Sequence, residues 1–265
     1  LWLDKDVLST LAVEDRAVRA ILLSRLDHPG KASRSYLISI LSALAADNDV
    51  RARLLLYLGD DADEDAPENY VCMEAANALA PLVPHDAEVR AALLTCMPKQ
   101  RGIALESMMR ALQPLMQHDA EVRAALLAYL EHTDGDLRST AVYALGEALA
   151  EDVTLRPLLM NCLTDPDLYV RAAAISALAS RIITDTEVRA TIVAHLTDSS
   201  EYVRFKALDA VQPLVLGDAE IRAAAIARLD DSDNDVRRAA IEALLPCCEQ
   251  DRELALRLLP ALPSL

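Results

Sequence analysis

One stretch of this chain has a composition that could hold a cation or attract a basic partner. Residues 59–70 form an acidic run whose carboxylates include Asp60, Asp61, Asp63, Glu64 and Asp65. The spacing of the aspartates does not match an EF-hand, because the glycine and the closing glutamate are out of place. Acidic runs of this kind are more often solvated surface loops than sites. We therefore predict an acidic loop that is either solvated or part of the rim of a partner-binding surface.

The histidines and cysteines do not group as metal ligands or as a catalytic set. His85 and His118 stand at equivalent places, each directly before an aspartate that can cap a helix. No H-E-x-x-H or C-x-x-C motif occurs, and the adjacent Cys247 and Cys248 lack a second pair at ligand spacing. A phosphate-binding loop and a G-x-S-x-G elbow are missing as well. We predict no catalytic residues, no metal, no cofactor and no enzymatic activity.

Twelve arginines recur at fixed distances from acidic residues, a pattern that could form an anion-binding ladder. Because each arginine comes with its own acid, a guanidinium bridge to a turn aspartate is the favoured interpretation. One set is predicted to be a structural ladder and comprises Arg34, Arg138, Arg171, Arg204 and Arg237. The other set comprises Arg19, Arg51, Arg90, Arg123, Arg156, Arg189 and Arg222.

Two alternating sequence patterns supply the elements that position these side chains. Pattern B, "DPDLYVRAAAISALA" at 165–179, returns after 33 residues as "DSSEYVRFKALDAVQ" and after 33 more as "DSDNDVRRAAIEALL". Pattern A is typified by "DAEVRAALLAYL" at 119–130. In both, apolar residues recur at three- and four-residue steps, which predicts an amphipathic helix. The aspartate that opens each copy of pattern A is the predicted N-cap. Prolines mark the turn that follows pattern B, at Pro81, Pro114, Pro213 and Pro246.

A single pair of such helices cannot bury its apolar stripes, so the pairs must stack. The predicted fold is all-α, a right-handed α-solenoid of stacked antiparallel helix pairs. We expect one solenoid over 1–265, with half-repeats at 1–14 and 249–265 and about seven pairs: 15–45, 47–82, 86–115, 119–149, 152–182, 185–215 and 218–248. Because the half-repeats lack partner helices, we expect a segment of a longer protein with further repeats or domains of the same polypeptide at both ends.

The pattern D-x-x-x-x-V-R-x-x-A-x-x-A-L resembles HEAT repeats, in the short form common in bacteria and in proteins of the phycobilisome-lyase type. It is carried, for example, by Asp165 with Val170, Arg171, Ala174 and Leu178, and it covers nearly the whole chain. The resemblance implies that B helices line the inner groove and A helices the outer face. It also leaves two alternative functions open: a bilin lyase-like or chaperone protein, and the ligand-sensing C-terminal arm of a larger nucleotide-binding ATPase of the immune-receptor type.

Composition restricts the partners. The formal net charge of −16, with only four lysines, opposes binding to nucleic acid and to anionic membranes. No apolar run approaches the roughly 20 residues that span a bilayer. The five cysteines are odd in number and scattered, which favours a reducing compartment, and we predict a cytoplasmic location.

Specificity in a repeat scaffold must come from positions outside the buried stripe. Two columns of such positions lie two and six residues after the valine of pattern B. The first column is Ser35, Met73, Glu106, Ser139, Ala172, Phe205 and Arg238, and the second is Ser39, Asn77, Arg110, Tyr143, Ser176, Asp209 and Glu242. Aromatic residues and arginines dominate interface hot spots. We therefore predict a non-enzymatic scaffold whose protein or peptide partner contacts Met73, Arg110, Tyr143, Phe205 and Arg238 in the B-helix groove.

Overall fold

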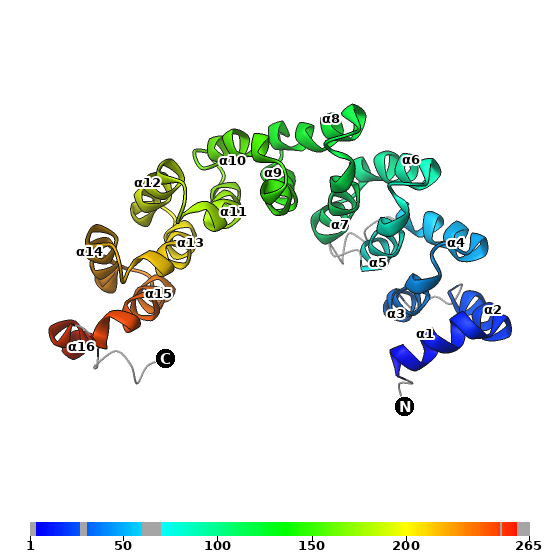
Figure 1. Cartoon of the computed structure of the whole chain (residues 1–265), viewed down its shortest axis with the longest axis horizontal. Helices are drawn as coiled ribbons and strands as arrows, with labels where there is room; N and C mark the ends of the chain where they lie inside the picture. The colour runs from blue at the N-terminus through cyan, green and yellow to red at the C-terminus, as the bar shows by residue number, and fades with distance from the viewer. Residues whose placement is uncertain (1–3, 27–30, 60–69, 250, 259–265) are drawn as a thin grey trace. The chain divides into compact units, whose positions relative to one another are not determined.

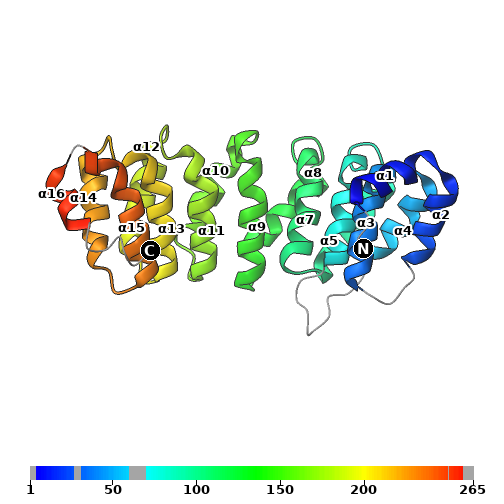
Figure 2. The same ribbon diagram turned by 90° about the horizontal axis from the view of Figure 1, so that it is seen from below.

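A computed structural model describes residues 4–26, 31–59, 70–249 and 251–258 of the chain. Over these residues the secondary structure is entirely helical, with α-helices joined by short 3₁₀ helices and turns and with no strand. Helices of pattern A and pattern B alternate and stack (Figures 1 and 2). The predicted all-α solenoid is confirmed. Within the described part, no helix has the length and the apolar character needed to cross a membrane.

The helices that carry pattern A are α2 (Arg16–Arg25), α4 (Asn48–Leu58), α6 (Ala87–Cys96), α8 (Ala120–Ala128), α10 (Arg156–Cys162), α12 (Thr186–Ala194), α14 (Ala219–Ala227) and α16 (Arg252–Leu258). Those that carry pattern B are α1 (Lys5–Glu14), α3 (Lys31–Leu41), α5 (Tyr70–Leu79), α7 (Gly102–Leu112), α9 (Gly135–Glu147), α11 (Leu168–Leu178), α13 (Glu201–Val211) and α15 (Asn234–Leu244). These two sets are the A helices and the B helices below.

Short 3₁₀ helices close most of these elements. They are η1 (Ser42–Leu44), η2 (Ala80–Leu82), η3 (Met97–Lys99), η4 (Gln113–Leu115), η5 (Tyr129–Glu131), η6 (Ala148–Ala150), η7 (Val153–Leu155), η8 (Ala179–Arg181), η9 (His195–Thr197), η10 (Gln212–Leu214), η11 (Arg228–Asp230) and η12 (Leu245–Glu249). The recurring prolines fall in four of them, among them Pro81 in η2 and Pro213 in η10. A proline here ends the α-helix because it cannot donate the next backbone hydrogen bond.

The chain divides into two compact units, Leu1–Leu145 and Gly146–Leu265. Unit 1 contains α1 to α8 and most of α9, and unit 2 contains the last residues of α9 and α10 to α16. Within each unit the A helices form one layer and the B helices the other (Figure 1). Consecutive B helices pack side by side from α3 to α7 in unit 1 and from α11 to α15 in unit 2. The B-helix layer of unit 2 consists chiefly of α11, α13 and α15.

The core of each unit lies between its two layers. In unit 2, Val170, Leu178 and Val203 of the B helices and Val188 and Ile192 of α12 are fully buried. Burying one such side chain contributes about 1.5–3 kcal/mol. Alanines on the same stripes are fully buried too: Ala173, Ala174, Ala207 and Ala240. Small side chains at these places let neighbouring helices approach closely.

Aspartate caps start most A helices, as the sequence predicts. The Oδ1 atom of Asp86 accepts hydrogen bonds from the amides of Glu88 and Val89 at 3.0 and 3.2 Å. Equivalent bonds are made by Asp119, Asp185 and Asp218. Each cap contributes about 1 kcal/mol to helix stability.

The third pair departs from this rule at the start of its B helix. The residue before α7 is Arg101, whose side chain makes no capping hydrogen bond. The helix opens instead on Gly102, whose φ of 51° lies in the left-handed region that favours glycine.

Candidate partner-binding surface

The exposed stripe of α13 is narrow, because this helix packs against α12 of the A layer and against the neighbouring B helices α11 and α15. On α13 the stripe consists of Tyr202, Phe205, Lys206 and Asp209. The pattern-B valine of this helix, Val203, is fully buried. Phe205, Lys206 and Asp209 follow Tyr202 by three, four and seven residues, a spacing that places all four on one face of a helix. Asp209 is exposed and the other three are half-buried. This face is the B-helix surface of the repeat.

The two predicted columns do not share one environment. Members of the second column are exposed or half-buried, as at Arg110, Tyr143 and Asp209. Members of the first column are mostly half-buried, and Ala172 is fully buried. The expectation that Ala172 lies outside the buried stripe is therefore wrong. Its position stands at the edge of the exposed stripe, and its small side chain is fully buried there.

The structure brings two of the predicted partner-binding residues together in one pocket of unit 2. The pocket has a volume of ≈ 360 Å³ and lies between α13 and α15. Its lining is Glu201, Tyr202 and Phe205 from α13, with Asp233, Asp235 and Arg238 from the start of α15. Phe205 and Arg238 thus face a common space, which the sequence could not show.

Charges inside this pocket are only partly paired. Nη2 of Arg238 lies 2.9 Å from Oδ1 of Asp235, and Nε of Arg238 lies 4.0 Å from Oε1 of Glu242. Pairs this exposed contribute about 0–1 kcal/mol and can exchange partners. Asp233 caps α15 by accepting from the amides of Asp235 and Val236. Glu201 forms no ion pair with any residue that the structure describes. Three carboxylates against one guanidinium leave the pocket net negative.

An aromatic cluster adjoins the pocket and extends onto α11. The ring centroids of Tyr169 and Tyr202 lie 5.8 Å apart at an interplanar angle of 57°. Nζ of Lys206 lies 5.7 Å from the centroid of Tyr202 and 5.8 Å from that of Phe205. Both distances are within the range of a cation–π interaction. The faces of the Tyr202 and Phe205 rings are thus positioned to interact with a positive charge.

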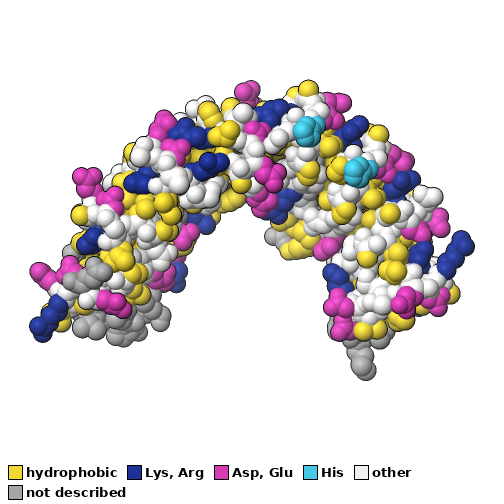
Figure 3. Space-filling view, viewed as in Figure 1, with side chains coloured by type: hydrophobic (Ala, Val, Ile, Leu, Met, Phe, Trp, Pro, Cys, Tyr) yellow, Lys and Arg dark blue, Asp and Glu magenta, His cyan; other side chains and the backbone are white. Residues whose placement is uncertain are grey.

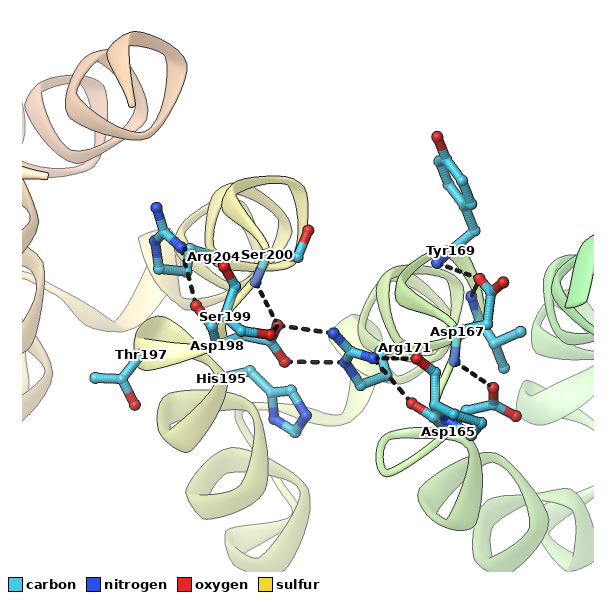
Figure 4. A network of polar contacts seen from close by, with 12 residues as sticks. Asp165, Asp167, Tyr169, Arg171, His195, Thr197, Asp198, Ser199, Ser200 and Arg204 are labelled. Carbon is cyan, nitrogen blue, oxygen red and sulfur yellow. Dashed lines mark hydrogen bonds and ion pairs between the residues drawn. The ribbon is translucent and has the colours of Figure 1, made fainter. Parts of the chain in front are cut away.

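Sequence reasoning missed Tyr169, Tyr202 and Lys206. The positions of the two tyrosines could have been selected from the sequence. The residue before the pattern-B valine stands three positions before the first-column residue, so both lie on the same face of the helix. At that place the chain has aromatic residues in three repeats, Tyr70, Tyr169 and Tyr202. Tyr169 is 54% exposed and, in Figure 4, points away from the polar network beneath it.

The remaining predicted contact residues lie on the B helices of unit 1. Met73 is half-buried in α5, Arg110 is exposed in α7, and Tyr143 is 37% exposed in α9. Nη2 of Arg110 forms an ion pair of 2.6 Å with Glu106, one helical turn earlier. The acidic loop residues Asp60, Asp61, Asp63, Glu64 and Asp65 lie outside the described residues.

The arginines of the B helices take part in a continuous network along unit 2 (Figure 4). Nε and Nη2 of Arg171 donate to the two carboxylate oxygens of Asp198 at 2.9 and 2.8 Å, while Nη1 donates to the carbonyls of Asp165 and Pro166. Arg204 repeats this geometry with Asp231, at 2.9 and 2.6 Å. These forked contacts are the strong form of a guanidinium–carboxylate pair.

Burial and pairing oppose one another at the aspartates of this network. Burial alone would raise the pKa of Asp198, but hydrogen bonds from Arg171 and from the amide of Ser200 outweigh it and lower the pKa. Asp231 behaves in the same way, with Arg204 as its partner. The side chains of Asp231 and Arg204 are 3% and 11% exposed, so the pair is largely shielded from solvent.

The other ladder arginines are held differently. Nη1 of Arg237 donates to the carbonyls of Asp231 and Ser232. Nη1 of Arg138 donates to the carbonyls of His132 and Thr133. Arg34 lies in α3 and is half-buried. Cysteine and leucine replace the arginine in α5 and α7, at Cys72 and Leu105, which are both fully buried.

Several arginines of the A helices reach the N-cap aspartate of the next A helix. Arg19 contacts Asp47 at 2.6 Å and Arg51 contacts Asp86 at 2.6 Å. The same relation joins Arg90 to Asp119 at 3.6 Å and Arg156 to Asp185 at 2.5 Å. Arg189 and Arg222 instead donate to backbone carbonyls of the preceding turn. The ion pairs therefore join neighbouring repeats. Acidic and basic side chains lie interspersed on the face shown in Figure 3.

A further set of inter-repeat contacts was not predicted. The penultimate residue of pattern A donates to the carbonyl at the end of the preceding A helix. Tyr57 donates to Leu26 at 3.0 Å, and Arg228 donates to Leu196 at 3.3 Å. His195 takes the same place, with Nε2 at 2.8 Å from the carbonyl of Leu163. The signal in the sequence is a polar residue directly before the closing leucine of pattern A.

Comparison with known proteins identifies the repeat. A family model described as HEAT repeats matches residues 85–179 and, in an overlapping match, 123–212. These residues are HEAT repeats. The resemblance drawn from the sequence is confirmed, and the HEAT fold is typical of protein-interaction scaffolds. No curated protein sequence matches the chain.

Solved structures with a similar fold include several repeat proteins. Escherichia coli YibA has a TM-score of 0.55 and 16% identity, over 98% of this chain and 97% of that chain. A mutant of Kap121p has a TM-score of 0.61 and 12% identity, over 97% of this chain but only 33% of that one. The CpcE–CpcF complex of phycocyanin lyase from Nostoc has a TM-score of 0.45 and 20% identity, over 92% and 93% of the two chains. At these identities YibA and Kap121p show a shared fold and nothing more.

Proposed function

We propose that this chain is a non-enzymatic HEAT-repeat scaffold that binds a protein partner on its B-helix surface. The observation that carries the proposal is the contrast between the two kinds of polar residue. The arginines and aspartates of the repeat motif contact one another or the backbone, as Arg171 and Asp198 do. The residues of the B-helix stripe vary in type from repeat to repeat, and a charged member such as Arg238 pairs along its own helix, with Asp235 and Glu242.

The variable residues have the chemistry of an interface. Tyr143 and Tyr169 are large and exposed, and Phe205 lies in the pocket between α13 and α15. Rigid aromatic side chains bury much area at little cost in conformational entropy, and they are enriched among hot spots. A layer of parallel helices offers such residues at regular intervals to a helix or an extended segment of a partner.

Photo-crosslinking tests the proposal while the partner is still unidentified. The photoreactive amino acid p-benzoylphenylalanine replaces Tyr143 or Tyr169 on B helices, or Leu56 or Leu256 on A helices, in lysate of the source organism. All four positions are exposed, and each pair samples both units. We expect the two B-helix positions to capture the same protein and the two A-helix positions not to capture it. Equal capture from the A helices would contradict the proposal.

A purified partner then allows an affinity measurement. Tyr143→Ala and Phe205→Ala should each weaken binding by about 1–3 kcal/mol. Leu56→Ala removes a side chain of similar size from an exposed A-helix position and should leave affinity unchanged. Far-UV circular dichroism checks that the variants keep their helix content.

A further inference from the structure

We infer that the pocket between α13 and α15 binds an arginine side chain of a basic segment of the partner protein. The inference rests on the proposed function and specifies its chemistry at one place. The pocket combines two features that a guanidinium group needs, namely aromatic faces and carboxylates within one space of ≈ 360 Å³.

The aromatic part is formed by Tyr202 and Phe205. The ammonium of Lys206 lies within 6 Å of both centroids, at 5.7 and 5.8 Å, which is within the range of a cation–π interaction. A guanidinium is planar and weakly hydrated, so it stacks on an aromatic face better than an ammonium does. An incoming arginine can therefore compete with Lys206 for the rings.

The charged part is formed by carboxylates on both walls. Glu201 stands on α13 and Asp235 on α15, and both are exposed residues in the first turn of their helices. Asp235 is engaged with Arg238 at 2.9 Å, in a pair whose side chains are 70% and 50% exposed. Such a pair is weak, so Asp235 can turn from Arg238 to a second guanidinium at little cost.

Charge complementarity selects a basic partner over the alternatives. The pocket lining has an excess of two negative charges, counting Glu201, Asp233 and Asp235 against Arg238, and an excess of one remains when the adjoining Lys206 is included. The whole chain carries a net charge of −16, which attracts basic proteins over a long range and repels nucleic acid and anionic lipid. A basic protein segment is attracted both by the negative charge of the pocket and by the negative net charge of the chain.

The single phenylalanine of the chain provides a local probe. Because Phe205 is the only phenylalanine, incorporation of 4-fluorophenylalanine gives one fluorine resonance that reports on this pocket. The labelled chain is titrated with four octapeptides of alternating sequence. They are Gly-Arg, Gly-Lys, Gly-citrulline and Gly-Glu peptides, of which the citrulline peptide keeps the shape of arginine without its charge.

We expect the Gly-Arg peptide to shift the resonance saturably and more tightly than the Gly-Lys peptide. Glu201→Gln combined with Asp235→Asn should weaken the Gly-Arg affinity at least about five-fold. The control is Glu187→Gln combined with Glu220→Gln, which removes two first-turn acids from the A helices α12 and α14 and keeps the same net charge. Its affinity should fall by less than about two-fold, through the overall field alone.

Lys206→Met supplies a test in the opposite direction. Removing the ammonium that occupies the rings should tighten binding of the Gly-Arg peptide about two- to five-fold. Lys99→Met removes one exposed charge from η3 in unit 1 and should change the affinity less. Equal effects of the two lysine substitutions would show that the rings take no part, and would overturn the proposed stacking.

The possible outcomes separate this inference from the proposed function. A shift by the Gly-Glu or Gly-citrulline peptide without one by Gly-Arg overturns the arginine assignment and leaves peptide binding on the B-helix surface intact. If no peptide shifts the resonance, the inference is wrong, and the crosslinking from Tyr143 still decides the proposed function. Equal losses in the two double variants would mean that the peptide responds to net charge and not to this pocket.

Discussion

Gly146→Ala tests how closely the C-terminal end of α9, which belongs to unit 2, approaches α11. Gly146 is the penultimate residue of α9, and it faces Ala177 of α11. A Cβ atom added at Gly146 would lie 2.5 Å from Cβ of Ala177 and 3.1 Å from its Cα. Carbon atoms in contact are about 3.5–4.0 Å apart, so one of the two helices must move by about 1 Å.

Two opposing effects set the magnitude. Overpacking of this kind costs about 1–3 kcal/mol. Alanine is a better helix former than glycine by up to about 1 kcal/mol, an advantage that shrinks near a helix end. We therefore expect a net loss of about 1–2 kcal/mol in the free energy of unfolding.

The assay is urea unfolding followed by far-UV circular dichroism, with hydrogen exchange of the amides in α9 and α11. Hydrogen exchange is needed because repeat arrays can unfold in stages. Ala177→Gly opens the space again, so in the Gly146→Ala background it should recover at least about half of the lost stability. The reasoning about close approach is refuted if Gly146→Ala is as stable as the parent, or if Ala177→Gly adds its own cost instead of compensating.

Three further predictions concern stability. Arg204→Met leaves the carboxylate of Asp231, which is 3% exposed, without its forked partner and should cost about 2–4 kcal/mol. Arg90→Met breaks a longer, half-buried pair of 3.6 Å and should cost less than about 1 kcal/mol, and the melting temperatures of the two variants compare these costs. The hydrogen bond from Arg156 lowers the pKa of Asp185 to about 2, so its contribution is complete above the ordinary pKa of about 3.9 and is lost as the pH falls toward 2; unfolding measured across this window should depend less steeply on pH in Asp185→Asn. Gly102→Ala forces a side chain into a φ of 51° and should lower the unfolding free energy by about 1 kcal/mol, measured by urea titration, and an unchanged midpoint would contradict it.

The sequence predicts the layers of this fold well, because period and polarity determine which residues one helix must bury. The caps at Asp86 and Asp119 and the fully buried Val170 and Val203 could all be read from the repeat. Contacts between repeats are harder to predict from the sequence, because they depend on distances between helices that the repeat period does not determine. Arg156 reaches the next cap while Arg189, at the same place in the motif, binds carbonyls instead.

The candidate pocket shows the same limit. Phe205 and Arg238 could be selected by type and position, but their shared space depends on the separation of α13 and α15. The approach of Tyr169 to Tyr202 likewise depends on how neighbouring B helices are rotated. Ala172 was misplaced for a related reason, because a periodic pattern gives an angle around the helix and not the reach of the next helix.

The forked pairs of unit 2 have a consequence for how the array forms. Oδ1 of Asp198 accepts from the amide of Ser200 within its own turn and also from Arg171 of the preceding repeat. Asp231 does the same with the amide of Asp233 and with Arg204. One carboxylate thus accepts from an amide of its own turn and from the arginine of the preceding repeat. When the turn is ordered, its carboxylate is already positioned to accept from that arginine. Folding of one repeat should therefore favour folding of its neighbour, and loss of one arginine–aspartate pair between repeats should also destabilise the turn that carries the aspartate.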